Sequence, residues 1–174
     1  MAVHQDCQLL IMRHGKSDWG QGINRDFDRP LSERGNSDAR NIGMWLSRQD
    51  IATDVFISSP AVRARETAII VSSELGVDTA DVIWEPYLYE ATLADLLTVI
   101  GKYSKRNRNI LLIGHNPGLE SLLCYLAKDE PDRTPSGKLM TTSAVAILDY
   151  GAAPVSVKPH SAHLKKLMRP RQLL

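Results

Sequence analysis

The sequence has few of the features that mark secreted or membrane proteins. Among 174 residues there are two cysteines, Cys7 and Cys124, and their separation fits neither a CxxC motif nor a metal-ligand pair. They could form a disulfide, but two isolated cysteines in such a chain are more often reduced. No apolar run approaches the roughly 18 residues of a membrane-spanning helix. The first residues, MAVHQDCQ, show no signal-peptide pattern, so we expect a cytoplasmic protein.

The sequence also has little excess charge. The net charge is +1, which gives no general attraction to nucleic acid or to a membrane surface. Hydrophobic residues make up 43% of the chain, enough for a continuous core. The length suits one domain, which we predict to cover residues 1–174.

Short apolar runs alternate along the chain with amphipathic segments. Five runs are predicted as strands: Gln8–Arg13, Asp54–Ser58, Asp81–Glu85, Asn109–Gly114 and Ser143–Tyr150. Val155–Lys158 is predicted as a sixth, edge strand. Four segments repeat apolar residues with the period of a helix: Ser32–Arg48, Pro60–Leu75, Thr92–Tyr103 and Pro117–Lys128.

This alternation predicts an α/β fold. We expect a three-layer sandwich, in which a mostly parallel sheet of five or six strands carries helices on both faces. The predicted N-caps are Ser32, Ser59, Thr92 and Asn116, with Pro60 and Pro117 in first helical positions. The segments predicted to be irregular are Lys16–Pro30, Asp129–Met140 and the tail from Pro159.

Two predicted strands end in a histidine. The first runs into Arg13 and His14, and the fourth runs into His115. The second ends at Ser58-Ser59, and the helix that follows carries Arg63 in its first turn. In parallel α/β sheets, ligands bind beyond the carboxyl ends of the strands. Because helix N-termini attract anions and arginine matches phosphate oxygens, we predict an oxyanion pocket that contains two imidazoles.

Each of these features alone has an ordinary structural explanation. A single histidine near a strand end is usually structural or exposed, and a lone arginine in the first turn of a helix is usually a solvated charge. The functional interpretation rests on all of them falling at one edge of one sheet.

Five segments in order resemble the histidine phosphatase superfamily, the phosphoglycerate-mutase-like group. They are IMRHGKS, RPLSERG, SSPAVRARETA, IGHNPG and TTSAVAILDY, within Gln8–Tyr150. The sequences of three segments, DRPLSERG, LYEAT and IGHNPGLE, are most similar to those of SixA-type phosphohistidine phosphatases. The resemblance implies a phosphoglycerate-mutase-like fold and a phosphatase. It implies that His14 is the nucleophile, that Arg13 and Arg63 bind phosphate, and that His115 contacts the phosphoryl group.

Three further residues have less specific matches. Glu90, in LYEAT, falls near the acidic proton donor of many members, but it could equally be a surface carboxylate that caps the helix at Thr92. Ser17 and Asn24 fall in the loop where mutases place further substrate contacts.

The segment after Glu90 is shorter than the one that covers the site in mutases. An open pocket is therefore expected, which favours an exposed phosphate such as one on a protein.

The implied reaction has two steps. His14 attacks phosphorus, and water then hydrolyses the phosphohistidine, so that one difficult step becomes two. We expect Arg13 and Arg63 to keep His14 neutral, and the backbone around Gly15 or Ser17 to orient its other ring nitrogen. No metal or other cofactor is expected, because side chains supply the positive charge.

The favoured substrate is phosphohistidine in a protein. One alternative is a phosphomonoesterase for a small metabolite, for which Glu90 would be the expected acid. An alternative of another class is a non-catalytic phosphate-binding or scaffold domain. A mutase is least favoured, because the covering segment is short.

Overall fold

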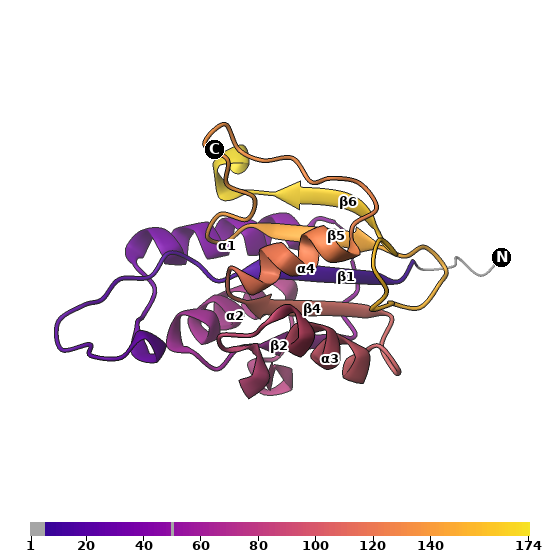
Figure 1. Cartoon of the computed structure of the whole chain (residues 1–174). Coiled ribbons are helices and arrows are strands. Elements are labelled where there is room, and N and C mark those ends of the chain that lie inside the picture. The colour runs from indigo at the N-terminus through magenta and orange to yellow at the C-terminus, as the bar shows by residue number, and fades with distance from the viewer. Residues whose placement is uncertain (1–5, 50) are drawn as a thin grey trace.

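The computed structural model describes residues 6–49 and 51–174. Six strands form one sheet in the order β3-β2-β4-β1-β5-β6 (Figure 1). Their bounds are β1 Gln8–Arg13, β2 Val55–Ser58, β3 Ile83–Trp84, β4 Asn109–Gly114, β5 Val145–Asp149 and β6 His163–Met168. The four strands from β3 to β1 are parallel, whereas β5 and β6 are antiparallel to their neighbours. The predicted α/β fold with a mostly parallel sheet is confirmed.

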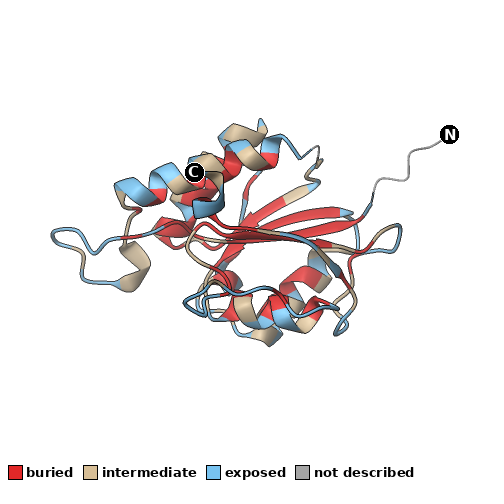
Figure 2. Cartoon of the chain, turned by 90° about the horizontal axis from the view of Figure 1, so that it is seen from above, coloured by how far each residue is buried: buried red, intermediate tan, exposed pale blue. Residues whose placement is uncertain are grey.

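Helices cover both faces of the sheet. They are α1 Glu33–Ser47, α2 Val62–Leu75, α3 Leu93–Tyr103 and α4 Gly118–Leu126, with 3-10 turns η1 Asp26–Asp28, η2 Thr79–Asp81, η3 Pro86–Leu88 and η4 Pro170–Leu173. Helices α1 and α2 pack on one face, and α3 and α4 pack on the other. Figure 2 shows the buried sheet between the two helical layers.

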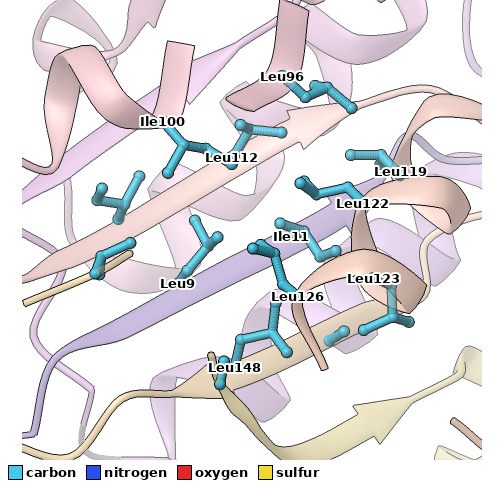
Figure 3. Close-up of a cluster of buried hydrophobic side chains, with 14 of the residues drawn as sticks. Leu9, Ile11, Leu96, Ile100, Leu112, Leu119, Leu122, Leu123, Leu126 and Leu148 are labelled. Atoms are coloured by element: carbon cyan, nitrogen blue, oxygen red, sulfur yellow. The ribbon is translucent and has the colours of Figure 1, made fainter. Parts of the chain in front are cut away.

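The alternation of side chains along β1 explains the two cores. Leu9 and Ile11 point to the cluster formed with α3 and α4, which Figure 3 shows, whereas Leu10 and Met12 join the cluster under α1 and α2. All four are at most 2% exposed. Since burying one such side chain contributes about 1.5–3 kcal/mol, β1 is fixed on both faces, and so is the position of the residues that follow it.

Two of the four predicted N-caps are confirmed. The Ser32 hydroxyl accepts the Gly35 N–H, and Thr92 forms a capping box with Asp95. The other two helices begin later than predicted, with Ala61 and Pro117 at their N-cap positions. In the first of these, the Ser59 hydroxyl accepts the Ala61 N–H in a turn before the helix.

The predicted sixth strand is wrong. Residues 155–158 are not a strand, although Val155 is buried, and the edge strand is His163–Met168, inside the tail predicted to be irregular. Its apolar pattern is broken by Lys165 and Lys166 and by a bulge opposite Ile147 and Leu148. Exposed lysines are typical of edge strands, where they prevent pairing with another chain. Strand β3 is also shorter than predicted, because a 3-10 turn precedes it.

Cys7 is buried and Cys124 is exposed, and both are free thiols. Among the described residues, no helix is long and apolar enough to cross a membrane. The start of the chain, on which the signal-peptide expectation rests, lies partly outside the described residues.

Candidate active site

The register of β1 and β4 brings the two histidines together. Arg13 pairs with Gly114 in the parallel ladder, so His14 and His115 are the first residues after two adjacent strands. The His14 N–H donates to the Gly114 carbonyl at 3.1 Å, and the two imidazole centroids lie 5.0 Å apart. The two histidines therefore lie side by side beyond the ends of these strands, as their places in the sequence predict.

Strand β2 brings Arg63 to the same place. Ser58 pairs with Ile113 of β4, and α2 begins four residues further on. The Thr67 hydroxyl accepts the Gly15 N–H at 3.0 Å and donates to the Arg63 carbonyl at 2.7 Å. One hydroxyl therefore joins the first turns of α2 to the residue after His14.

The hydrogen bonds of His14 fix its tautomer. Nδ1 lies 2.7 Å from the Gly15 carbonyl, which can only accept, so Nδ1 carries the proton. This is the expected backbone contact. Nε2 lies 3.3 Å from Nε of Arg63, which can only donate. The lone pair of Nε2 therefore faces the guanidinium.

His115 has the opposite tautomer. Its Nδ1 lies 3.4 Å from Nη2 of Arg63, so the lone pair is on Nδ1. Its Nε2 lies 2.8 Å from the Ser59 hydroxyl and carries the proton. Both histidines thus direct an unprotonated nitrogen at one guanidinium group.

Both imidazoles are held neutral. Burial, followed by the neighbouring His115, lowers the pKa of His14 to about 3. Burial, followed by the charge of Arg63, lowers the pKa of His115 to about 4. For His14 burial is the main cause of the lowered pKa, and the two arginines expected to keep it neutral, Arg63 and Arg13, contribute less.

Arg13 lines the same cavity as His14. Its Nη1 donates to the Met140 carbonyl at 2.9 Å, while its buried Nε has no hydrogen-bond partner within the described residues. Buried donors are seldom left unpaired, so the protein contacts of Arg13 leave part of its donor capacity unused.

A cavity of about 780 Å³ joins these groups. Arg13, His14, Arg63 and His115 line it, together with Ser17 and Glu90. Its volume is in the range of small-molecule pockets. Asn24, by contrast, is exposed and is not among the lining residues.

Glu90 lies on the wall of the cavity. It is exposed and has a φ of 52°, a left-handed conformation uncommon outside glycine. Helix α3 is capped by Thr92 and Asp95, so the interpretation of Glu90 as its cap is wrong. A role for Glu90 as an acid remains a prediction.

The comparisons with known proteins agree with this geometry. A model of the histidine phosphatase superfamily (branch 1) matches residues 9–96. The chain belongs to the histidine phosphatase superfamily. Its fold is similar to that of the protein histidine phosphatase SixA complexed with tungstate, with a TM-score of 0.79 and 24% identity over 96% of this chain and 99% of that one. It is also similar to a protein from Agrobacterium tumefaciens assigned as SixA, with a TM-score of 0.75 and 27% identity over 94% and 99%.

Sequence relatives are less informative about the substrate. An uncharacterised protein of Mycobacterium tuberculosis is 31% identical over 92% of this chain and 100% of its own length. The 2,3-bisphosphoglycerate-dependent phosphoglycerate mutase of Methylobacterium radiotolerans is 34% identical, but the match covers only 51% of this chain and 42% of the mutase. Family and fold together support a phosphatase.

Sequence analysis missed three residues of this histidine phosphatase site. Asp26 and Arg29 line the cavity, and Asp26 contacts Arg63. The Tyr89 ring lies edge-on to His115, with centroids 5.6 Å apart. Asp26 and Arg29 come from a segment without periodicity, and Tyr89 adjoins the suggested acid Glu90, so no pattern marked them.

No group of three or more histidine, cysteine, aspartate or glutamate side chains is placed to hold a metal within residues 6–49 and 51–174. The expectation of a metal-independent reaction remains a prediction.

Proposed function

We propose that this histidine phosphatase works without a metal, through a phosphohistidine formed on His14. The observation that carries the proposal is the environment of Nε2 of His14, a neutral nitrogen whose lone pair faces Arg63. A nucleophile needs an unprotonated nitrogen, whose lone pair is released when a phosphoryl group replaces the long contact to Arg63, and the arginines at the site supply charge for the phosphoryl oxygens.

In the first step, the lone pair of Nε2 forms a bond to phosphorus, and the bond from phosphorus to the leaving group breaks with its electron pair. The imidazole then carries a positive charge, which the hydrogen bond from Nδ1 to the Gly15 carbonyl stabilises. Arg13 and Arg63 donate to the oxygens that carry the charge of the transferring group, and His115 can join them when its Nδ1 takes up a proton.

In the second step, water attacks phosphorus and the P–Nε2 bond breaks. The electron pair returns to Nε2, and the water proton is lost to solvent or to the released phosphate. Both steps use the same positioned groups, which is the main contribution that a protein makes to phosphoryl transfer.

The proposed substrate is phosphohistidine in a protein. SixA, whose fold this chain shares, is a protein histidine phosphatase. Only α3 and a short turn separate Glu90 from β4, so little chain is available to cover the cavity. When the phosphorylated imidazole of the substrate is protonated, it leaves as neutral imidazole and needs no further acid.

We propose that the protein acts in the cytoplasm.

A phosphomonoesterase for a small metabolite is the second candidate. The position of Glu90 on the cavity wall favours it, because an alkoxide leaving group needs a proton donor. The third candidate, a phosphate-binding or scaffold domain, uses the same arginines without turnover.

The test compares turnover of a phosphohistidine protein, p-nitrophenyl phosphate and sugar phosphates, in the presence of a chelator. His14→Ala should abolish turnover, whereas His163→Ala, an exposed substitution on β6, should not. Preference for the phosphohistidine protein supports the proposal. Preference for a small ester with a requirement for Glu90 selects the second candidate. Phosphate binding without His14-dependent turnover selects the third.

A further inference from the structure

Asp26 holds one edge of the Arg63 guanidinium. It begins η1, in the segment between β1 and α1 that projects from the body of the molecule (Figures 1 and 2). Its backbone carbonyl accepts from Nη1 of Arg63 at 2.6 Å, and its Oδ2 accepts from Nη2 at 2.8 Å. Two acceptors on one residue therefore fix the outer edge of a guanidinium that is buried in the site.

The inner edge of the same group faces the two histidines. Nε points to Nε2 of His14 at 3.3 Å, and Nη2 points to Nδ1 of His115 at 3.4 Å. These contacts are longer than those to Asp26. A phosphoryl group on His14 would meet the inner edge and replace the long contacts, leaving the outer ones in place.

Asp26 is itself held from two sides. Its Oδ1 accepts from Nε of Arg29 at 2.9 Å, and its Oδ2 accepts from the Tyr89 hydroxyl at 3.1 Å. Partial burial acts to raise the pKa of Asp26, but the hydrogen bond and charge of Arg63 outweigh it, and the pKa is lowered. The carboxylate therefore stays ionised and cannot act as the proton donor.

A carboxylate next to an anion-binding arginine could instead compete with the anion. The edge that Asp26 occupies argues against competition, because Nε and the inner side of Nη2 remain directed at the histidines. The backbone carbonyl contact has the same consequence, since it lies on Nη1 at the outer edge.

We infer that Asp26 is a positioning residue, which orients Arg63 toward the phosphoryl group and joins the projecting segment to the site. The role of Asp26 in turnover rests on the proposed function. Its effect on phosphate binding can be tested whether or not the protein turns over substrate.

The experiment compares Asp26→Ala with Asp28→Ala, a matched control in the same turn, whose carboxylate lies 3.7 Å from the exposed Arg25. The readouts are kcat/KM for p-nitrophenyl phosphate and calorimetric binding of inorganic phosphate. Because misplacing one group can cost on the order of 10²-fold in rate, Asp26→Ala should lower kcat/KM by about 10–100-fold. It should also weaken phosphate binding, whereas Asp28→Ala should change neither by more than about 2-fold.

A double-mutant cycle separates positioning from a general structural effect. In an Arg63→Ala background, Asp26→Ala should have almost no further effect on phosphate binding, because Asp26 acts through Arg63. An equal loss in both backgrounds would overturn the inference. So would tighter phosphate binding by Asp26→Ala, which would mean that the carboxylate competes with the anion.

A second variant covers the case in which Asp26→Ala does not fold. Asp26→Asn keeps the backbone carbonyl contact and removes the charge, and it should weaken phosphate binding in the same direction but less. Unchanged or tighter binding by folded Asp26→Asn would overturn the inference. If wild type shows no His14-dependent turnover, the proposed function fails, while the phosphate-binding comparison still decides the role of Asp26.

Discussion

At the scale of single residues, the site depends on two buried neutral histidines. Each has one ring nitrogen within hydrogen-bond distance of a protein acceptor, Gly15 for His14 and Ser59 for His115, and its other nitrogen faces Arg63. If either imidazole were charged, two positive groups would face each other in a buried site. The neutral form of both rings is therefore favoured in the folded protein, and the free energy of unfolding depends on pH.

Stability should fall as the pH falls below about 6.5, the ordinary pKa of histidine, because unfolded histidines bind protons that folded His14 and His115 resist down to about 3 and 4. Each contributes up to about 1.4 kcal/mol per pH unit. Above about pH 6.5 both histidines are neutral in the folded and in the unfolded chain, so the stability is at its full value and no longer changes with their protonation. The free energy of unfolding, measured by urea denaturation between pH 5 and 7, should rise less steeply with pH for His14→Asn than for wild type.

The control for this measurement is His163→Asn, an exposed substitution that keeps both buried histidines. Equal slopes in wild type and His14→Asn would mean that His14 takes up a proton as readily in the folded protein as in the unfolded chain.

Arg63 should not tolerate lysine. Lysine keeps the charge but loses the planar fork, whose nitrogens reach Asp26, His14 and His115 together. Since one preorganised donor is worth about 10²–10³ in kcat, Arg63→Lys should lower kcat for p-nitrophenyl phosphate by about that factor. Arg65→Lys is the control, because Arg65 is exposed and lies over the Trp84 ring. Similar rates for both variants would show that charge alone is sufficient.

The sequence could predict the meeting of His14, His115 and Arg63, because each follows the end of an apolar strand and such ends share one edge of a parallel sheet. It could not predict Asp26 or Tyr89. Their contacts depend on the path of an irregular segment and on the turn η3, neither of which has a period that fixes the direction of a side chain.

At the scale of elements, close backbone contact fixes the start of α1. A Cβ built on Gly35 would lie 2.0 Å from the Lys16 carbonyl oxygen, so only glycine fits at that point. The Ser32 N–H also donates to that carbonyl. The first turn of α1 therefore holds the residue that follows His14 and Gly15.

Gly35→Ala should lower the free energy of unfolding by about 1–3 kcal/mol or more, as overpacking does. The control is Gly101→Ala in α3, where the nearest atom to a new Cβ would be 3.9 Å away, in Val157. Alanine in an open helix position should stabilise by about 0.5–1 kcal/mol. Chemical denaturation of both variants checks the opposite signs, and stabilisation by Gly35→Ala would contradict the close contact.

The elements that sequence patterns placed correctly each bury several apolar side chains. Strands β1, β2, β4 and β5 and helices α1 to α4 agree with their predicted bounds to within about two residues. Strand β6 was not predicted, because an edge strand buries fewer side chains and its two lysines interrupt the alternation of apolar and polar residues.

At the scale of the whole molecule, one sheet joins residues that are far apart in the chain. We propose that residues 1–174 form a single domain.

The last elements of the chain, β6 and η4, contact the loop before β5. Nε of Arg169 donates to the Leu139 carbonyl at 3.0 Å, and its Nη2 donates to the carbonyl of Asp132. The next residue, Met140, accepts from Arg13 and from Asn116 at the site. The end of the chain therefore supports Arg13 through a loop.

Arg169→Met should weaken this support without creating a large cavity. Two loop carbonyls would lose a charged donor, so the free energy of unfolding should fall by about 1–3 kcal/mol. Limited proteolysis should cut residues 129–140 faster, and phosphate binding should weaken because Arg13 loses its fixed partner. Arg171→Met, an exposed change in the same turn, is the control. Faster proteolysis with unchanged phosphate binding would mean that Arg13 holds its position independently of the chain end, and that the site is completed by β1, β2 and β4 alone.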